Sequence, residues 1–144
     1  MRVSEAMTRD VRIAGPGETL RKAAQTMAKL DAGSLPVGEN DQLVGMITDR
    51  DIAIRGIAAG KGPKAKVRDV MTKDIKYCFE NQEIDEITRN MADIQVRRLP
   101  VLNRDKRLVG ILSLGDIAVS SAGNGAGDAL RGISRPGGEH TQTG

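Results

Sequence analysis

The sequence predicts an α/β (α+β) fold made of two similar β-α-β-β-α halves, related by a pseudo-twofold axis and packed through their sheets. The first observation is an internal repeat, because Leu35-Pro36-Val37 returns 64 positions later as Leu99-Pro100-Val101. The second is that each copy alternates short apolar runs with helical periodicity. The third is length. The 144 residues suit one compact domain, whereas a half of about 60 residues would bury only about 60% of its extended surface.

The repeat also sets the domain boundaries that we expect. After Pro100 the shift becomes 65 positions, since Leu43-Val44-Gly45 returns as Leu108-Val109-Gly110. A one-residue insertion in the intervening turn accounts for this change. The last residues hold seven glycines and two large apolar side chains, too few to offset their ordering entropy. We therefore expect repeat 1 over residues 1–60, a linker over 61–66, repeat 2 over 67–121 and a disordered tail over 122–144.

The first half is predicted to begin with a helical lead-in at Val3–Met7. A short strand candidate follows at Val11–Ile13, and Gly15-Pro16-Gly17 ends it. Thr19 can cap a helix whose apolar residues recur at i, i+3, i+4 and i+7, and Gly33 is expected to end that helix. Two strands at 35–37 and 43–48 precede a second helix over 49–59, on which Ile52, Ala53 and Ile57 are expected to share one side.

The second half is predicted to repeat this order. A strand at residues 75–78 leads to a helix lined by Ile84, Ile87, Met91 and Ile94. Strands at 99–102 and 108–113 then precede a helix over 114–121. The apolar stripes of both halves are expected to form the core, and Cys78 is expected to be a small buried side chain within it.

Composition argues against several classes of function. Aromatic residues are nearly absent, which disfavours stacking on single-stranded nucleic acid. No apolar run of about 18 residues is present, so no membrane span is expected. The N-terminus lacks a signal peptide, and one cysteine allows no intrachain disulfide, so a cytoplasmic location is expected. Cys78 and His140 alone cannot form a structural zinc site or a catalytic pair, and no phosphate-binding Walker loop occurs, so we expect no metal and no enzyme activity.

Two tetrapeptides carry the candidate chemistry, Thr48-Asp49-Arg50-Asp51 and Ser113-Leu114-Gly115-Asp116. Each follows an apolar strand and opens a helix. One interpretation is structural, since a hydroxyl at a helix start and an acid three residues later resemble a capping box. The other is functional, because a helix N-terminus and a hydroxyl attract phosphate and a carboxylate accepts hydrogen bonds from a ribose diol. Both interpretations remain open on spacing alone.

The surrounding residues resemble a known family. Gly33 to Val37 followed by Leu43 to Asp51 resembles the CBS motif, and so does Val96 to Val101 followed by Leu108 to Asp116. The lead-in Val-x-x-x-Met-Thr fits the family at both Val3 and Val67. Two tandem copies resemble a CBS pair, or Bateman module, over residues 3–121. The resemblance implies a stand-alone regulatory module of bacterial type that forms a flat homodimer.

The resemblance also implies an adenosine ligand, such as AMP, ADP, ATP, NAD or S-adenosylmethionine, bound in clefts between the repeats. It assigns phosphate to the hydroxyl and ribose to the carboxylate of each motif. It places the base against the first strand and the pre-proline segment of the opposite repeat. One expected site comprises Thr48, Arg50, Asp51, Ile75, Lys76, Val96 and Arg98. The other expected site comprises Val11, Ala32, Gly33, Ser34, Arg97, Ser113 and Asp116. Tyr77 or Phe79 could pack on an adenine.

We therefore expect a regulatory module in which an adenine nucleotide or NAD acts as the ligand rather than as a required cofactor. Ligand binding would shift the populations of two conformations that an unknown effector protein reads. One alternative is a CBS-fold interaction scaffold with vestigial ligand sites. A less favoured alternative is a nucleic-acid-binding module, for which basic residues such as Arg97 and Arg98 would supply a patch with steep salt dependence.

Overall fold

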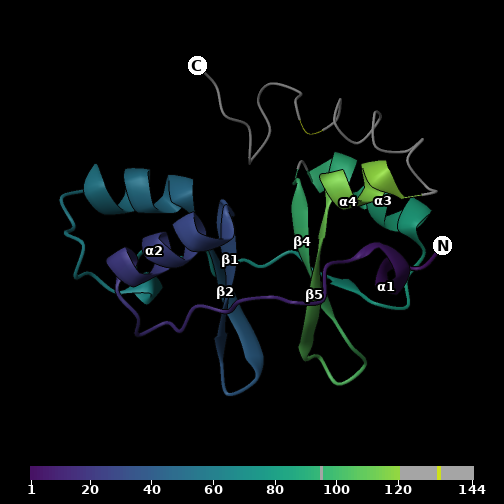
Figure 1. Ribbon diagram of the computed structural model, residues 1–144, viewed down its shortest axis with the longest axis horizontal. Helices are drawn as coiled ribbons and strands as arrows, with labels where there is room; N and C mark the ends of the chain where they lie inside the picture. The colour runs from purple at the N-terminus through teal and green to yellow at the C-terminus, as the bar shows by residue number, and fades with distance from the viewer. Residues whose placement is uncertain (95, 121–132, 134–144) are drawn as a thin grey trace. The chain divides into compact units, whose positions relative to one another are not determined.

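The computed structural model describes residues 1–94, 96–120 and 133 of the chain (Figure 1). The chain divides into two compact units, and each has its own hydrophobic core. Unit 1 comprises Met1–Val11 and Lys76–Gly144, and unit 2 comprises Arg12–Ile75. Apart from Ile133, the predicted disordered tail lies outside the described residues.

Unit 2 is a β-hairpin with helices packed on it. It contains helix α2 (Leu20–Leu30), strands β1 (Ser34–Glu39) and β2 (Gln42–Thr48), the π-helix η1 (Asp51–Ile57) and the 3-10 helix η2 (Val67–Asp69). The two strands are antiparallel. Asn40 and Asp41 connect them with φ angles of 54° and 64°. Positive φ at both central residues is typical of a type I′ turn, which suits the twist of a two-residue hairpin.

Unit 1 shares the order helix, two strands, helix with unit 2, but its lead-in helix comes first in the chain and it has one more strand. It contains α1 (Val3–Ala6), β3 (Cys78–Phe79), α3 (Ile84–Ile94), β4 (Arg98–Leu102), β5 (Leu108–Ser113) and α4 (Leu114–Val119) (Figure 1). The sheet order is β3-β4-β5, with β3 parallel and β5 antiparallel to β4. The mixed α/β fold with two small sheets confirms the predicted fold class.

The lead-in segment of each sequence repeat packs in the unit that holds most of the other repeat. In unit 1, Thr8 bridges Ile111 of β5, and a Cβ added to Gly110 would lie 2.7 Å from the sulfur of Met7. In unit 2, Thr72 bridges Met46 of β2, and a Cβ added to Gly45 would lie 2.8 Å from the sulfur of Met71. A glycine in each strand therefore makes room for a methionine that enters from the lead-in segment.

The first long helix of unit 2 begins where the sequence predicts but ends earlier. The hydroxyl of Thr19 accepts a hydrogen bond of 3.1 Å from the Lys22 N–H, as expected for an N-cap. The helix ends at Leu30 rather than at Gly33, because Asp31 adopts a left-handed conformation with φ 53°. Aspartate tolerates this conformation better than most residues, so it can stop a helix without glycine.

The strand predicted at Val11–Ile13 is wrong. Only Ala14 pairs with β1, through its N–H to the Pro36 carbonyl and through the Gly38 N–H to its own carbonyl. Gly15 and Pro16 follow at once, and proline has no N–H with which to continue a ladder. The corresponding strand in unit 1 is also shorter than the predicted range 75–78, since β3 covers only Cys78–Phe79.

The helix predicted over residues 49–59 is present, but most of it is a π-helix. It is helical from Asp49, but from Asp51 it has π-helical bonding, for example from the Ala58 N–H to the Ala53 carbonyl at 2.8 Å. The wider turn changes which residues face the core. Gly56 is buried, Ile52 is half-buried, and Ala53 and Ile57 are exposed, so the predicted common face is wrong. No helix among residues 1–94 and 96–120 is long and apolar enough to cross a membrane.

Candidate functional site

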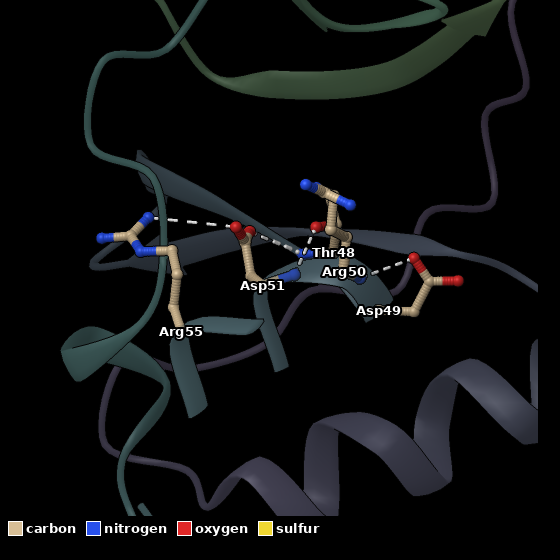
Figure 2. Close-up of polar contacts among 5 residues, drawn as sticks. All are labelled: Thr48, Asp49, Arg50, Asp51 and Arg55. Atoms are coloured by element: carbon tan, nitrogen blue, oxygen red, sulfur yellow. Dashed lines mark hydrogen bonds and ion pairs between the residues drawn. The ribbon is translucent and has the colours of Figure 1, made fainter. Parts of the chain in front are cut away.

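The motif at the end of β2 forms a reciprocal cap. The hydroxyl of Thr48 accepts a hydrogen bond of 3.0 Å from the Asp51 N–H, and Oδ2 of Asp51 accepts one of 3.0 Å from the Thr48 N–H (Figure 2). The structural part of the capping-box interpretation is therefore present. Each capping bond uses one oxygen of its side chain. The second oxygen of Asp51, Oδ1, faces Arg55 at 3.9 Å from its guanidinium nitrogen.

The motif at the end of β5 has the same geometry. The hydroxyl of Ser113 accepts a hydrogen bond of 3.0 Å from the Asp116 N–H, and Oδ2 of Asp116 accepts one of 3.0 Å from the Ser113 N–H. Among the described residues no ion pair reaches Asp116. The residue four positions later is Ser120, whose hydroxyl donates to the Ile117 carbonyl. The two caps are thus alike in backbone geometry and different in charged surroundings.

Each cap lies beside the first residue of the preceding strand. In unit 2, Ser34 is the register partner of Thr48, and the Asp49 N–H donates to the Gly33 carbonyl at 2.9 Å. In unit 1, Arg98 is the register partner of Ser113, and the Leu114 N–H donates to the Arg97 carbonyl at 2.8 Å. The structure therefore brings the pre-proline segment of each repeat together with the motif of that same repeat.

Two charged residues near the first cap were not among the predicted site residues. Oδ1 of Asp49 accepts a hydrogen bond of 2.8 Å from the Arg50 N–H, so a carboxylate occupies a position at the helix start where a phosphate oxygen could bind (Figure 2). A Cβ on Gly33 would lie 3.2 Å from the same carboxylate, which favours glycine there. Arg55 stands four residues after Asp51, and an i, i+4 acid–arginine spacing on a helix could have identified it.

The remaining predicted site residues are distributed over both units. Ala32 and Ile75 are half-buried residues of unit 2, and Val11, Lys76 and Val96 are half-buried residues of unit 1. The Ala32 N–H donates to the Met27 carbonyl at 3.0 Å, directly after α2. The assignment of these residues to a site shared with the opposite repeat stays a prediction.

The region around β3 contains the two aromatic rings. Tyr77 and Phe79 contact each other edge to face, with ring centroids 5.6 Å apart. Cys78 lies between them in sequence and is buried in the core of unit 1, as predicted. Burial raises the pKa of its thiol from 9.0 to about 12, which disfavours the reactive thiolate. Among the described residues, no group of three or more His, Cys, Asp or Glu side chains is placed to hold a metal ion.

Comparison with known proteins identifies the family to which the two repeated motifs belong. The sequence profile of the CBS domain matches residues 3–55 and 67–123. This chain therefore belongs to the CBS domain family and carries two tandem CBS domains. The CBS domain-containing protein YhcV of Bacillus subtilis is 39% identical to it over 133 residues, which cover 92% of this chain and 94% of YhcV.

Two solved structures resemble the chain in fold as well as in sequence. A crystal structure of Hypoxic Response Protein I, with two coordinated zinc ions, matches with a TM-score of 0.74 and 42% identity, and it covers 82% of this chain and 97% of that protein. Hypoxic response protein 1 of Mycobacterium tuberculosis is 44% identical over 116 residues, 79% of this chain and 80% of its own. The CBS domain pair of protein MJ0100, in complex with 5′-methylthioadenosine and S-adenosyl-L-methionine, matches with a TM-score of 0.73 and 25% identity, over 82% of this chain and 93% of that one.

Proposed function

We propose that this protein is a regulatory module that binds an adenosine-containing ligand through its two Thr/Ser-x-x-Asp motifs. In this proposal the carboxylates of Asp51 and Asp116 accept hydrogen bonds from ribose hydroxyls, and the hydroxyls of Thr48 and Ser113 lie toward the phosphate or its replacement. The observation that carries the proposal is the repetition of one polar geometry at the end of a strand in both units. The complex of the MJ0100 pair with two adenosine compounds supports the ligand class.

Capping does not exhaust the hydrogen-bonding capacity of these aspartates. An ionised carboxylate offers about four lone-pair sites on two oxygens, and the cap uses only Oδ2 in each motif. A ribose diol presents two hydroxyl donors to a single carboxylate. The cap itself holds each carboxylate in a fixed position, so little side-chain entropy would be lost when a ligand binds.

We further propose that the two motifs prefer different substituents on the ribose. The Ser113 motif carries no carboxylate other than Asp116, and the Leu114 N–H donates to the carbonyl of Arg97, a residue of the same expected site whose guanidinium suits a phosphate. The Thr48 motif has the Asp49 carboxylate on the Arg50 N–H, which repels a phosphate at that point. A neutral or cationic substituent, as in methylthioadenosine or S-adenosylmethionine, suits the Thr48 motif better.

The regulatory part of the proposal is a population shift. A ligand that binds one conformation of the pair better than another changes their populations by its differential affinity alone. A separate effector protein would read the change. We also propose that residues of the opposite repeat complete each site. In the site with Asp51 these residues include Ile75 and Lys76.

The test is isothermal titration of the purified chain with AMP, ATP, NAD, S-adenosylmethionine, methylthioadenosine and GMP, paired with thermal denaturation. Wild type is compared with Asp51→Asn, Asp116→Asn and the double variant, because asparagine keeps an oxygen for the cap and removes the charge. Asp69→Asn is the matched control, since its Oδ2 also accepts from the backbone N–H three residues earlier, that of Lys66, at 3.3 Å and outside both motifs.

We expect saturable binding of an adenosine compound and no binding of GMP. A ligand at 100 times its dissociation constant should add about 2.7 kcal/mol of stability. Asp116→Asn should weaken phosphorylated ligands most, and Asp51→Asn should weaken the sulfonium or thioether ligands most. Loss of binding in the control as well, or no binding of any adenosine compound by folded wild type, would overturn the proposal in favour of a scaffold with vestigial sites.

A further inference from the structure

In unit 2, the start of α2 is joined to residues 63–68 by four backbone hydrogen bonds of 2.8–3.1 Å. The donors are the N–H groups of Leu20, Arg21, Val67 and Arg68, and the acceptors are, in the same order, the carbonyls of Ala65, Pro63, Glu18 and Pro16. The bonds run in both directions, so the two segments lie side by side. We call residues 16–22 and 63–68 the clamp of unit 2.

The clamp carries five cationic side chains. All five are exposed, and we define them together as the basic surface: Arg21, Lys22, Lys64, Lys66 and Arg68. Among the described residues, no ion pair reaches any of these five side chains. The two acids nearest in sequence, Glu18 and Asp69, each accept a hydrogen bond from a backbone N–H. The positive charge of the clamp is therefore left to solvent or to a partner.

The sign of this charge is unfavourable for the helix that carries part of it. The first turn of α2 contains Arg21 and Lys22 and no acid, whereas the N-terminal end of a helix dipole favours negative charge. The three cations on the neighbouring segment add repulsion between like charges. Local choices that oppose stability are expected where a surface has a function, because folding alone does not favour them.

Unit 1 forms the equivalent clamp with a different charge. Its donors are the N–H groups of Ile84, Val3 and Ser4, and their acceptors are the carbonyls of Met1, Gln82 and Glu80, each at 2.9 Å. At the positions of Arg21 and Lys22, α3 has Asp85 and Glu86. Because the same backbone arrangement forms with acids at the start of the helix, the cations of unit 2 are not needed to build it.

We propose that the basic surface binds an acidic segment of a different protein. Carboxylates of that segment pair with the exposed cations and offset the repulsion among them, so charge complementarity favours the complex. Each exposed ion pair contributes little alone, but several on one short segment give an attraction that weakens with salt. The proposal goes beyond adenosine binding and does not depend on it.

A nucleic acid is less well matched to this surface. Unit 2 contains eleven lysines and arginines and eight acids, so without the five cations of the basic surface its acids outnumber its cations. A phosphate backbone that continued past the surface would meet net negative charge on the rest of unit 2. Unit 2 also has no aromatic residue on which a base could stack. A short segment with several carboxylates matches a positive charge that is this local.

The experiment is a fluorescence anisotropy titration of the full chain, without adenosine compounds, into a labelled peptide of ten glutamates. A labelled single-stranded oligonucleotide and a DNA duplex of comparable charge are titrated in parallel. One variant changes the helix side of the basic surface (Arg21→Glu with Lys22→Glu), and another changes the loop side (Lys64→Glu with Lys66→Glu). The matched control is Lys29→Glu with Lys73→Glu, which makes the same change in net charge at exposed positions of unit 2 outside the basic surface. Thermal denaturation followed by circular dichroism establishes that each variant is folded.

We expect saturable binding of the glutamate peptide that weakens with salt, with a dissociation constant about tenfold higher or more in each surface variant. The control should bind the peptide like wild type. The helix-side variant should melt no earlier than wild type, because its new carboxylates suit the first turn of α2. Absence of peptide binding by wild type, or equal loss in the control, would overturn the proposal. Binding of either DNA as tightly as the peptide would overturn it in favour of a nucleic-acid surface.

Discussion

Asp51 and Asp116 occupy equivalent positions in the two units and make the same pair of capping hydrogen bonds, yet their surroundings differ in charge. Asp51 has the Asp49 carboxylate and the Arg55 guanidinium close by, whereas Asp116 has Leu114 and Ser120 at those positions. The cap depends only on a hydroxyl and an acid three residues apart. The residues between and after them are therefore free to diverge, and a duplicated scaffold can keep its geometry while its two halves acquire different ligand preferences.

The largest effect on the two units should come from a cavity made in one hydrophobic core at a time. Ile47 and Leu112 are equivalent, and both are completely buried. Ile47→Ala and Leu112→Ala should each cost about 2–5 kcal/mol of unfolding free energy in urea denaturation. Hydrogen exchange resolved by segment should then separate the units. Leu112→Ala should expose residues 1–8 together with β4 and β5, and faster exchange of residues 1–8 in Ile47→Ala instead would contradict the observed assignment of that segment.

A smaller effect is expected from filling the two glycine positions. A Cβ at Gly110 would lie 2.8 Å from the Thr8 carbonyl, and one at Gly45 would lie 2.9 Å from the Thr72 carbonyl. Backbone must move in each case, so Gly110→Ala and Gly45→Ala should each cost about 1–3 kcal/mol in urea denaturation. Gly17→Ala is the matched control, since nothing lies within 4 Å of its added Cβ. Equal stability of all three variants would mean that the lead-in segments do not pack tightly against the strands.

The smallest effect concerns Cys78, whose counterpart in the other unit is Ala14. Burial raises the pKa of this thiol to about 12, so the folded state keeps the proton that the unfolded state loses near pH 9. The stability that depends on this proton is complete below about pH 9 and is lost as the pH rises toward about 12. Cys78→Ala should cost about 1 kcal/mol at pH 7.

The difference in unfolding free energy between wild type and Cys78→Ala should therefore shrink above pH 8 and change sign before pH 10.5, as urea denaturation would measure. All other residues are common to the two proteins, so their contributions cancel in this comparison. Parallel stability curves for the two proteins over the whole range would show that the Cys78 proton is not linked to folding.

Much of the fold can be predicted from the sequence where the signal is local. The hairpins β1–β2 and β4–β5 follow from short apolar runs separated by polar turns, and α3 begins and carries its buried residues where the 3.6-residue period places them. The helical type of η1 could not be predicted in this way. The π-helical turns of η1 change which side chains face inward, and a period that assumes an α-helix assigns Ile57 to the wrong side.

The sequence also does not predict which sheet each lead-in segment packs against. Val3 and Met7 form an apolar pattern that predicts burial, but nothing in the pattern says which sheet buries them. For the candidate site, the capping residues are predicted because their spacing is local. The spacing does not identify Asp49, since its role depends on the Arg50 N–H and on the absence of a side chain at Gly33.

The placement of residues 1–8 beside β5 has a consequence for synthesis on the ribosome. These residues leave the exit tunnel about 100 residues before Ile111, which pairs with Thr8, and that interval lasts on the order of 5–20 s at cellular translation rates. All of unit 2 emerges within that interval and can form its own core. Val3 and Met7 belong to the core of unit 1 and remain uncovered until β5 emerges, so the nascent chain presents these two apolar side chains to chaperones throughout that interval.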